Sequence, residues 1–206
     1  MAYQDDIKKA AALLLPWNKL SGCNILVTGA TGLIGGCLVD VLMAHKGRNY
    51  NVYASGRNEE RAGRRFLKYA DDNAFHFVKY DVAQPLEYDV NFQYIIHAAS
   101  GAYPEEFIKH PVEVIKGNIN GLDNLMGYGI QHGIKRLLYI SSGEVYGEGD
   151  GRVFTENYSG YVDCTSLRSC YPSSKRAAET LCISYGAEYG LSLIHISEPT
   201  RLRCIS

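Results

Sequence analysis

The sequence lacks an excess of charge of either sign. Its 206 residues contain 21 Lys and Arg against 22 Asp and Glu, which leaves a formal net charge of −1 at pH 7. A binding surface for nucleic acid or for an anionic membrane needs many positive charges. The composition therefore gives no case for a nucleic-acid or membrane partner, and the length suits one soluble domain with a substantial core.

Paired cysteines and long apolar runs are missing as well. The six cysteines are scattered without a Cys-x-x-Cys pair, which argues against a metal site and is typical of reduced thiols in a cytoplasmic protein. The apolar run Ala10 to Leu15 follows two aspartates and ends at Pro16. It is too short to span a membrane, and it lacks the basic residues of a secretory signal. We expect residues 3–15 to form an amphipathic helix that covers the sheet.

The sequence does contain a glycine-rich turn between a predicted strand at 24–27 and a predicted helix at 33–43. Gly29 lets the chain turn sharply after the strand, and Gly32 lets backbone N–H groups approach a pyrophosphate. Gly35 lets the helix pack close to the sheet. A helix N-terminus also favours negative charge. This context predicts a dinucleotide-binding site, and an ordinary strand-to-helix turn is the alternative interpretation.

Strand and helix patterns continue to alternate along the chain. The predicted strands are at 50–54, 74–80, 94–99 and 136–140, and the predicted helices are at 57–69, 111–133 and 171–189. Such alternation predicts an α/β fold, a doubly wound parallel sheet with helices on both faces. Ligands of these sheets bind at the carboxyl ends of the strands, so polar residues there are candidates for function.

Two strand ends carry candidate contacts for the adenosine half of a dinucleotide. The second strand leads into Arg57, where an acidic residue often binds the ribose 2′-hydroxyl. Arg57 either pairs with a 2′-phosphate, which would favour NADP, or is a solvent-exposed residue at a helix start. After the third strand, Asp81 can bind the adenine amino group with Val82 against the ring, and a turn aspartate is the alternative.

The fourth predicted strand ends in small residues. These small residues, Ala98 to Gly101, would let a cofactor lie close to the backbone. We interpret His97 as a packed core histidine, because no Cys, His or carboxylate has metal-ligand spacing around it. Asn118, in the next helix, is either solvent-exposed or hydrogen-bonded to a backbone group near an active site.

The candidate catalytic residues follow the fifth strand. Tyr171 and Lys175 are four residues apart and share one face of a helix. A lysine ammonium beside a phenol favours the phenolate, which predicts a lowered pKa for Tyr171 and a usable general base or acid. The Ser142 hydroxyl can hydrogen-bond both the substrate oxygen and the tyrosine. Together they would take a proton from a carbinol while hydride leaves its carbon for nicotinamide.

Over residues 20–190, this ordered set resembles the extended short-chain dehydrogenase/reductases, the NAD(P)-dependent sugar-nucleotide epimerases and dehydratases. The resemblance implies a Rossmann fold, tightly bound NAD or NADP, a nucleotide-sugar substrate and a homodimer formed through the helices at 111–133 and 171–189. The implied cofactor contacts are Gly29, Thr31, Gly32, Leu33, Ile34, Arg57, Asp81, Val82, Ala98, Ala99, Asn118, Tyr171 and Lys175. The implied catalytic residues are Ser142, Glu144, Tyr171 and Lys175.

The subfamily depends on a few positions. Sugar-nucleotide 4,6-dehydratases usually show Thr-Asp-Glu after the fifth strand, whereas this chain has Ser142, Gly143 and Glu144 there. Residues 156–182 look more like UDP-glucuronate decarboxylases, which oxidise the sugar at C4, lose the C6 carboxylate as carbon dioxide and reduce the ketone again. Those enzymes typically carry an acidic residue where this chain has Arg57. A decarboxylase is the leading hypothesis. A 4-epimerase, a 4,6-dehydratase and a non-catalytic dinucleotide-binding domain are the alternatives.

The final residues, 191–206, resemble the translation of a transposase adapter used in DNA library preparation. A genuine strand at 191–196 is the alternative. We expect an N-terminal helix and lead-in at 1–20, an NAD(P)-binding domain with the catalytic residues at 21–190, and a non-native tail at 191–206, with the C-terminal substrate domain missing. His195 and Cys204 are accordingly given no functional role.

Overall fold

The computed structural model describes residues 2–151, 153–197 and 201–202, with side chains through residue 192 apart from that of residue 152. The chain forms two compact units. The first comprises residues 1–81 and 87–99, and the second comprises residues 82–86 and 100–206. Each unit is described by itself.

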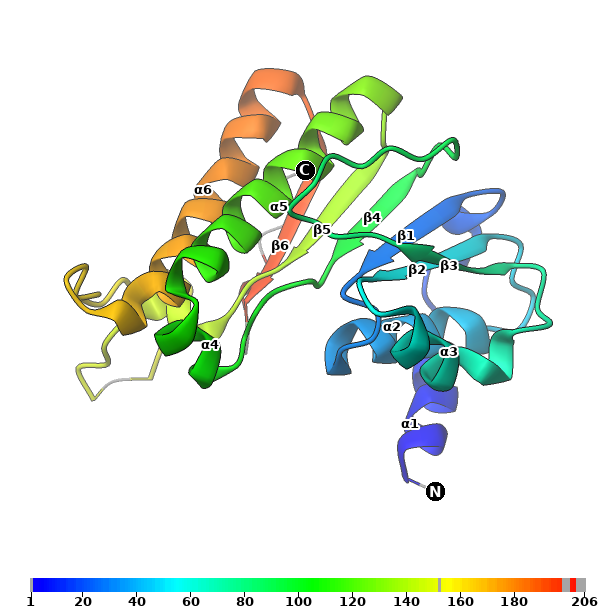
Figure 1. Cartoon of the computed structure of the whole chain (residues 1–206). Coiled ribbons are helices and arrows are strands. Elements are labelled where there is room, and N and C mark those ends of the chain that lie inside the picture. The colour runs from blue at the N-terminus through cyan, green and yellow to red at the C-terminus, as the bar shows by residue number, and fades with distance from the viewer. Residues whose placement is uncertain (1, 152, 198–200, 203–206) are drawn as a thin grey trace. The chain divides into compact units, whose positions relative to one another are not determined.

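The first unit contains a parallel sheet in the strand order β3-β2-β1-β4 (Figure 1). At the centre of the sheet, Val27 of β1 lies beside Ala54 of β2 on one side and beside Ile96 of β4 on the other. The elements of this unit are α1 (Ala2–Ala11), the 3₁₀ helix η1 (Trp17–Leu20), β1 (Asn24–Thr28), α2 (Leu33–Ala44), β2 (Asn51–Gly56), α3 (Glu59–Phe66), the 3₁₀ helix η2 (Leu67–Tyr69), β3 (Phe75–Lys79) and β4 (Tyr94–His97).

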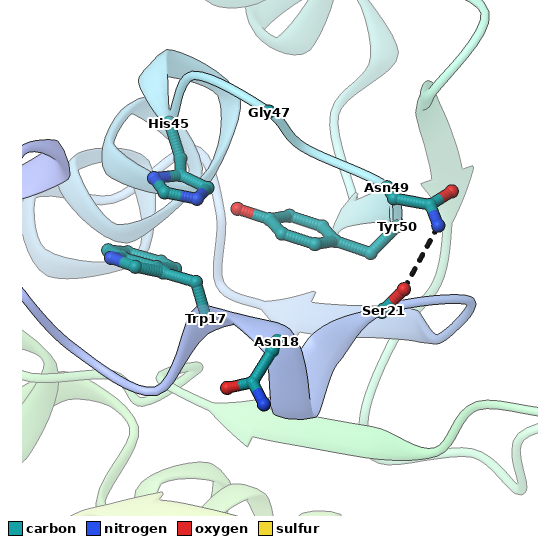
Figure 2. A pocket seen from close by; sticks show the side chains of 7 residues that line it. All are labelled: Trp17, Asn18, Ser21, His45, Gly47, Asn49 and Tyr50. Atoms are coloured by element: carbon teal, nitrogen blue, oxygen red, sulfur yellow. Dashed lines mark hydrogen bonds between the residues drawn. The ribbon is translucent and has the colours of Figure 1, made fainter.

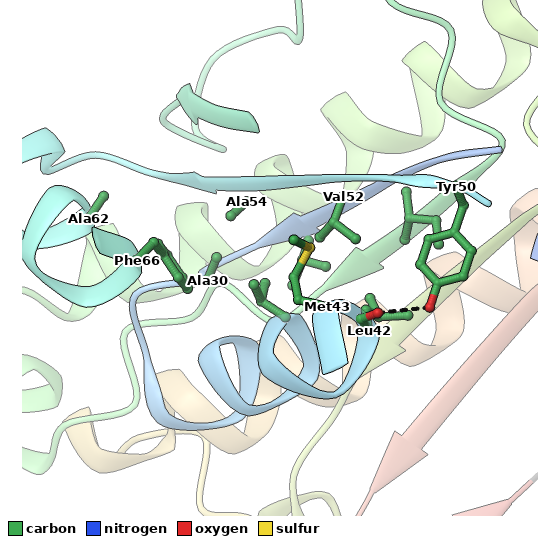
Figure 3. Close-up of a cluster of buried hydrophobic side chains, with 11 residues drawn as sticks. Ala30, Leu42, Met43, Tyr50, Val52, Ala54, Ala62 and Phe66 are labelled. Atoms are coloured by element: carbon green, nitrogen blue, oxygen red, sulfur yellow. Dashed lines mark hydrogen bonds between the residues drawn. The ribbon is translucent and has the colours of Figure 1, made fainter. Parts of the chain in front are cut away.

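Alternate residues of these strands form the core of the first unit. Val52 and Ala54 point to the same face of the sheet because successive side chains of a strand alternate. They pack in one buried cluster with residues of α2 and α3, including Met43 and Phe66 (Figure 3). The Tyr50 hydroxyl, at the edge of this cluster, donates a hydrogen bond of 2.9 Å to the carbonyl of Leu42. The apolar strand residues therefore fix α2 against the sheet.

A buried carboxylate ties together three segments that surround α2. Asp40 is fully buried on α2, and its oxygens lie 2.6 Å from Arg65, 2.9 Å from Lys68, 2.7 Å from the Tyr3 hydroxyl and 2.9 Å from the Tyr69 hydroxyl. Burial alone would raise the carboxyl pKa, but the hydrogen bonds from these four side chains outweigh burial and lower the pKa of Asp40 to about 2.

Helix α1 packs chiefly against α2, whereas we predicted that it covers the sheet. The buried side of α1 carries Ile7 and Ala11. Since α2 already contacts β1 and β2, α1 meets the outer side of α2, where Asp40 accepts the bond from Tyr3. The helix ends at Ala11, earlier than predicted, and the side chains of 13–15 are exposed.

The second unit is built on two long helices that pack side by side (Figure 1). Its elements are α4 (Pro104–Lys109), α5 (Pro111–His132), β5 (Arg136–Ile140), the 3₁₀ helices η3 (Gly143–Tyr146) and η4 (Leu167–Ser169), α6 (Cys170–Tyr189), β6 (Leu193–Ser197) and β7 (Arg201–Leu202). Strand β5 is parallel to β6, and β7 is antiparallel to β6. Helix α5 ends at Gly133, whose φ of 60° is the left-handed conformation that glycine adopts readily. Among the described helices, none is long and apolar enough to cross a membrane.

The predicted strands and long helices are confirmed, with boundaries that shift by one to a few residues. The short helix α4 was not predicted. It covers six residues, which is too few for a helical period to be recognised, although a proline at its first turn is a typical start.

Candidate functional site

The glycine turn of the first unit lies between β1 and α2. Gly29 has a φ of 65°, and a Cβ atom there would lie 2.6 Å from the Cα of Ala99 and 2.7 Å from the carbonyl carbon of Ala98. Glycine therefore provides both the sharp turn and a close approach to the end of β4. A Cβ on Gly35 would collide with the carbonyl oxygen of Gly29, so Gly35 lets α2 pack on the turn that follows β1. Helix α2 also contacts β1 and β2, in agreement with the prediction that Gly35 lets the helix pack close to the sheet.

The N-terminus of α2 suits a pyrophosphate. Gly32 is its N-cap residue, and no side chain caps the helix. The first two helical residues, Leu33 and Ile34, are 86% and 47% exposed. An open helix N-terminus presents N–H groups and a partial positive charge to an anion. On this observation the turn fits the phosphates of a dinucleotide.

The predicted adenosine contacts lie at the ends of β2 and β3. A Cβ on Gly56 would lie 3.5 Å from the Thr31 hydroxyl oxygen, so Thr31 stands beside the end of β2. Arg57 follows directly and is exposed. Asp81 follows β3 and belongs to the first unit, whereas the next residue, Val82, belongs to the second unit. The roles of these residues toward adenosine stay predictions.

His97 is a core residue, as predicted. It is fully buried, and its Nδ1 lies 2.7 Å from the hydroxyl oxygen of Thr28. That hydroxyl also accepts a hydrogen bond of 3.4 Å from the N–H of Ala99. The pair therefore orders the backbone where β4 ends. In the part of the chain that the structure describes, no cluster of His, Cys, Asp and Glu could hold a metal ion.

The first unit also contains a pocket of about 300 Å³, lined by Trp17, Asn18, Ser21, His45, Gly47, Asn49 and Tyr50 (Figure 2). The rings of Trp17 and His45 stack with their centroids 4.2 Å apart. Ser21 and Asn49 precede β1 and β2, so the pocket lies at the amino ends of these strands. Dinucleotides bind at the carboxyl ends, and this pocket is therefore not the predicted cofactor site.

In the second unit, three predicted site residues meet. Tyr171 is buried, and the side chains of Ser142 and Ser100 lower the pKa of its hydroxyl. Lys175 lies one helical turn further along α6 and is also buried. The sequence places Ser142 directly after β5, and the hydrogen bond from the Glu144 N–H to its hydroxyl oxygen begins η3.

Asn118 supports this cluster from α5. It is 1% exposed, which excludes the solvent-exposed alternative. Its carbonyl oxygen accepts a hydrogen bond of 2.7 Å from Ser100, and its amide group donates one of 2.9 Å to Ser174. Ser174 in turn donates to the backbone carbonyl of Tyr171 at 3.0 Å. The partners of Asn118 are thus hydroxyl groups, and through Ser174 it is linked to the backbone of Tyr171.

The predicted lowering of the tyrosine pKa is wrong for this structure. Burial raises the pKa of Tyr171, and the hydrogen bonds from the two serines offset only part of that rise. The Lys175 Nζ donates a 2.9 Å bond to the carbonyl of Ile140 and lies over the Tyr171 ring, 5.8 Å from its centre. Burial also lowers the pKa of Lys175 to about 7, so its charge at neutral pH is only partial.

Glu144 forms a two-pronged ion pair that was not predicted. Its carboxylate oxygens lie 2.6 Å and 2.7 Å from the two terminal nitrogens of Arg168. The Arg168 guanidinium carbon lies 4.7 Å from the centre of the Phe107 ring, and that ring stacks on Tyr171 with centroids 4.7 Å apart. The candidate acid-base residues Glu144 and Tyr171 are therefore connected through two residues that lie between them.

Neither Ser100 nor Arg168 was predicted as a site residue. Ser100 follows the small residues at the end of β4, a position where polar side chains are candidates in any parallel sheet. That rule could have found it. Arg168 precedes Tyr171 by three residues in an irregular segment, and no periodic pattern predicts where its side chain lies.

The fold and the turn define the class of the chain, a Rossmann-type α/β protein. Among solved structures it is similar to the UDP-Glc/GlcNAc 4-epimerase from Campylobacter jejuni, with a TM-score of 0.70 and 20% identity over 85% of this chain and 53% of that one. It is also similar to a dTDP-glucose 4,6-dehydratase from Streptomyces venezuelae, solved with NAD, with a TM-score of 0.70 and 22% identity over 84% and 55%. At these identities, the likeness concerns the fold.

The chain belongs to the NAD dependent epimerase/dehydratase family, whose model matches residues 25–197. UDP-glucuronic acid decarboxylase 6 of Arabidopsis thaliana is 35% identical over 176 residues, which cover 84% of this chain and 49% of the relative. UDP-glucuronic acid decarboxylase 1 of Danio rerio is 33% identical over 171 residues, covering 82% and 39%. The family resemblance inferred from the motifs is thus confirmed. The chain spans half or less of the length of the curated relatives it matches.

Proposed function

We propose that the intact protein is a nucleotide-sugar oxidoreductase of the UDP-glucuronate decarboxylase type. It would oxidise the sugar at C4 with NAD, release the C6 carboxylate as carbon dioxide and reduce the resulting ketone. The observation that carries the proposal is that Tyr171 and Lys175 are buried one turn apart on α6 in the second unit, with the Lys175 Nζ bonded to the carbonyl of Ile140, the last residue of β5 before the serines. The similarity to UDP-glucuronic acid decarboxylases supports the subtype.

NAD, when bound, would supply the hydride acceptor for C4 and the hydride donor for the ketone. In the first step, Tyr171 must ionise against its raised pKa before it takes the proton of the C4 hydroxyl, and Ser142 would hydrogen-bond the same oxygen. The carboxylate at C6 is then β to a ketone, so the electron pair of the breaking carbon–carbon bond is delocalised onto the ketone oxygen. The enolate that results takes a proton at C5, which restores the ketone. Lys175, whose pKa lies at about 7, can hold or release a proton near neutral pH. Asn118 and Ser100 keep the phenol in place.

We propose that the open N-terminus of α2, together with Gly29, Gly32 and Thr31, binds the pyrophosphate. Asp81 and Val82 would contact adenine, and Ala98 and Ala99 would line the cofactor. The match to an NAD dependent family supports NAD. The exposed Arg57 at the end of β2 is suited to a 2′-phosphate and supports NADP as a second candidate.

Epimerisation or dehydration is the second candidate activity, because the structures of similar fold include 4-epimerases and 4,6-dehydratases. Gly143, where dehydratases usually have an acid, disfavours dehydration. The variant Glu144→Gln separates the activities. An epimerase needs no carboxylate at that position and should keep its turnover, whereas an enzyme that uses the Glu144 carboxylate should lose most of it.

Tyr171→Phe tests the proposed function in the intact protein. We expect turnover of the nucleotide sugar to fall by about 100-fold or more, since a general acid-base group is removed. Tyr185→Phe is a matched control, because it removes a phenol of the same helix whose hydroxyl donates a hydrogen bond to Asp123 at the surface. Unchanged turnover in Tyr171→Phe would refute the mechanism.

We further propose a homodimer formed through α5 and α6, in a cytoplasmic protein. Exposed isoleucines on these helices support this interface: Ile115 is 38% exposed, Ile130 39% and Ile183 44%. Scattered cysteines, typical of reduced thiols, support the location. Analytical ultracentrifugation of the intact protein and of its Ile183→Glu variant tests the dimer. The variant should be a monomer, and an unchanged sedimentation rate would contradict the interface.

We also propose that residues 191–206 are derived from an adapter. The family model matches through residue 197, and β6 pairs with β5. Both observations require only a short apolar strand after residue 190, and the translated adapter sequence provides one. Long-read sequencing of the source DNA across codon 190 tests this proposal. A different continuation of the reading frame is the expected result, and recovery of the same tail would refute it.

A further inference from the structure

The starting observation is the ion pair between Glu144 on η3 and Arg168 on η4. Both guanidinium–carboxylate contacts are short, at 2.6 Å and 2.7 Å, and they form the parallel two-bond geometry that only arginine offers. The side chains of Arg168 and Glu144 are 50% and 36% exposed. An exposed ion pair contributes little to stability, so stability alone gives no reason for this arrangement.

The second observation is that the same guanidinium is packed against the tyrosine support. Arg168 lies over the face of Phe107, which is 2% exposed. Phe107 stacks on Tyr171 with an angle of 21° between the ring planes. The phenol ring of Tyr171 is therefore held on this side by a cation–aromatic–aromatic stack that begins at the ion pair.

We propose that Arg168 is a positioning residue that fixes the Glu144 carboxylate in place and, through Phe107, fixes the ring of Tyr171. Its positive charge also lets a carboxylate stay close to a phenol that must ionise, since an unpaired anion there would oppose the phenolate. The inference rests on the proposed function, because it assigns a role to Arg168 within that reaction.

The charged and titratable groups around the phenol are few. They are Glu144 from η3, Arg168 from η4, Cys170 and Lys175 from α6, and Tyr139 from β5. Of the two charges in the ion pair, Glu144 raises the pKa of Tyr171 and Arg168 lowers it. Removing Arg168 should therefore raise the pKa of Tyr171, and removing Glu144 should lower it.

The first experiment measures the pKa of Tyr171 by NMR of isotope-labelled tyrosine rings, with Tyr171→Phe to assign the resonance. We expect Arg168→Gln to raise this pKa, Glu144→Gln to lower it, and the double variant to return it close to the wild-type value. A residue that only supports the loop would not produce shifts of opposite sign that cancel. An unchanged pKa in Arg168→Gln would overturn the proposal.

The second experiment measures steady-state turnover of the intact protein. Arg168→Gln should lower kcat by about 10-fold to 100-fold, the effect of misplacing a catalytic group by roughly an ångström, with a smaller change in KM. Arg168→Lys keeps the charge without the two-pronged geometry, so it should restore the pKa of Tyr171 but only part of kcat. If Arg168→Gln does not fold, the same two measurements on Arg168→Lys test the proposal.

The matched control is Arg64→Gln, which breaks an exposed Arg–Glu pair in the first unit, where Arg64 lies 3.2 Å from Glu60. It should leave kcat and the pKa of Tyr171 unchanged. If Arg168→Gln matches this control in both measurements, the proposal is refuted. If the wild-type protein turns over no nucleotide sugar, the proposed function fails, and the pKa shifts alone still decide whether Arg168 controls Tyr171.

Discussion

Replacing Asp40 by asparagine should destabilise the first unit, because this carboxylate is fully buried and bonded to four side chains. Its pKa falls from 3.8 to about 2. Each pKa unit corresponds to about 1.4 kcal/mol, so the ionised form contributes about 2 kcal/mol at neutral pH. Arg65 and Lys68 are partly exposed and can recover water. We therefore expect Asp40→Asn to cost about 2 kcal/mol, below the 3–5 kcal/mol typical of a buried pair that loses one partner.

The pH dependence of stability provides a second part of this test. Because the folded pKa of Asp40 lies below the unfolded value, its contribution is complete above pH 3.8 and is lost as the pH falls toward about 2. The difference between wild type and Asp40→Asn should therefore shrink over that interval. Urea unfolding followed by fluorescence measures it, and Asp6→Asn, at an exposed pair with Lys9, is the control. A loss within about 0.5 kcal/mol of that control at neutral pH would refute the reasoning.

Three further predictions concern the cofactor and the active site. Gly29→Ala should abolish dinucleotide binding in calorimetry, since its Cβ would lie 2.6 Å from the backbone of Ala99; retained affinity would contradict the close approach. Lys175→Met should raise the free energy of unfolding while abolishing turnover. The folded lysine titrates near pH 7 and the unfolded one at 10.5, so the gain should be complete below pH 7 and absent above 10.5; a gain that grows with pH would contradict the burial argument. Arg57→Ala should weaken NADP binding more than NAD binding, and an equal effect on both would exclude a phosphate contact.

Most of the fold could be predicted from the sequence because its patterns are local. Residues 136–140 form a strand with the predicted bounds, and Gly133 ends the preceding helix as its conformational freedom allows. The packing of α1 could not be predicted in this way. Its apolar face is visible in the sequence, but whether that face meets a strand or another helix depends on what already covers the sheet.

The site, like the fold, has features that local sequence patterns predict and features that depend on contacts in the folded chain. The spacing of Tyr171 and Lys175 placed both on one face of a helix, which the structure confirms. The direction of the tyrosine pKa was wrong because it depends on burial and on where the lysine amine points, and neither is encoded in a four-residue spacing. Ser100 and Arg168 reach Tyr171 and Glu144 from distant parts of the chain, so only the folded structure brings them together.

The measurement that tests the central claim most directly is product analysis of the intact protein incubated with UDP-glucuronate and NAD. Mass spectrometry of the nucleotide sugar should show loss of one carbon dioxide, without accumulation of reduced cofactor, because the hydride taken from C4 is returned. A product that keeps its carboxylate, or UDP-glucuronate recovered unchanged, would contradict the proposed decarboxylation.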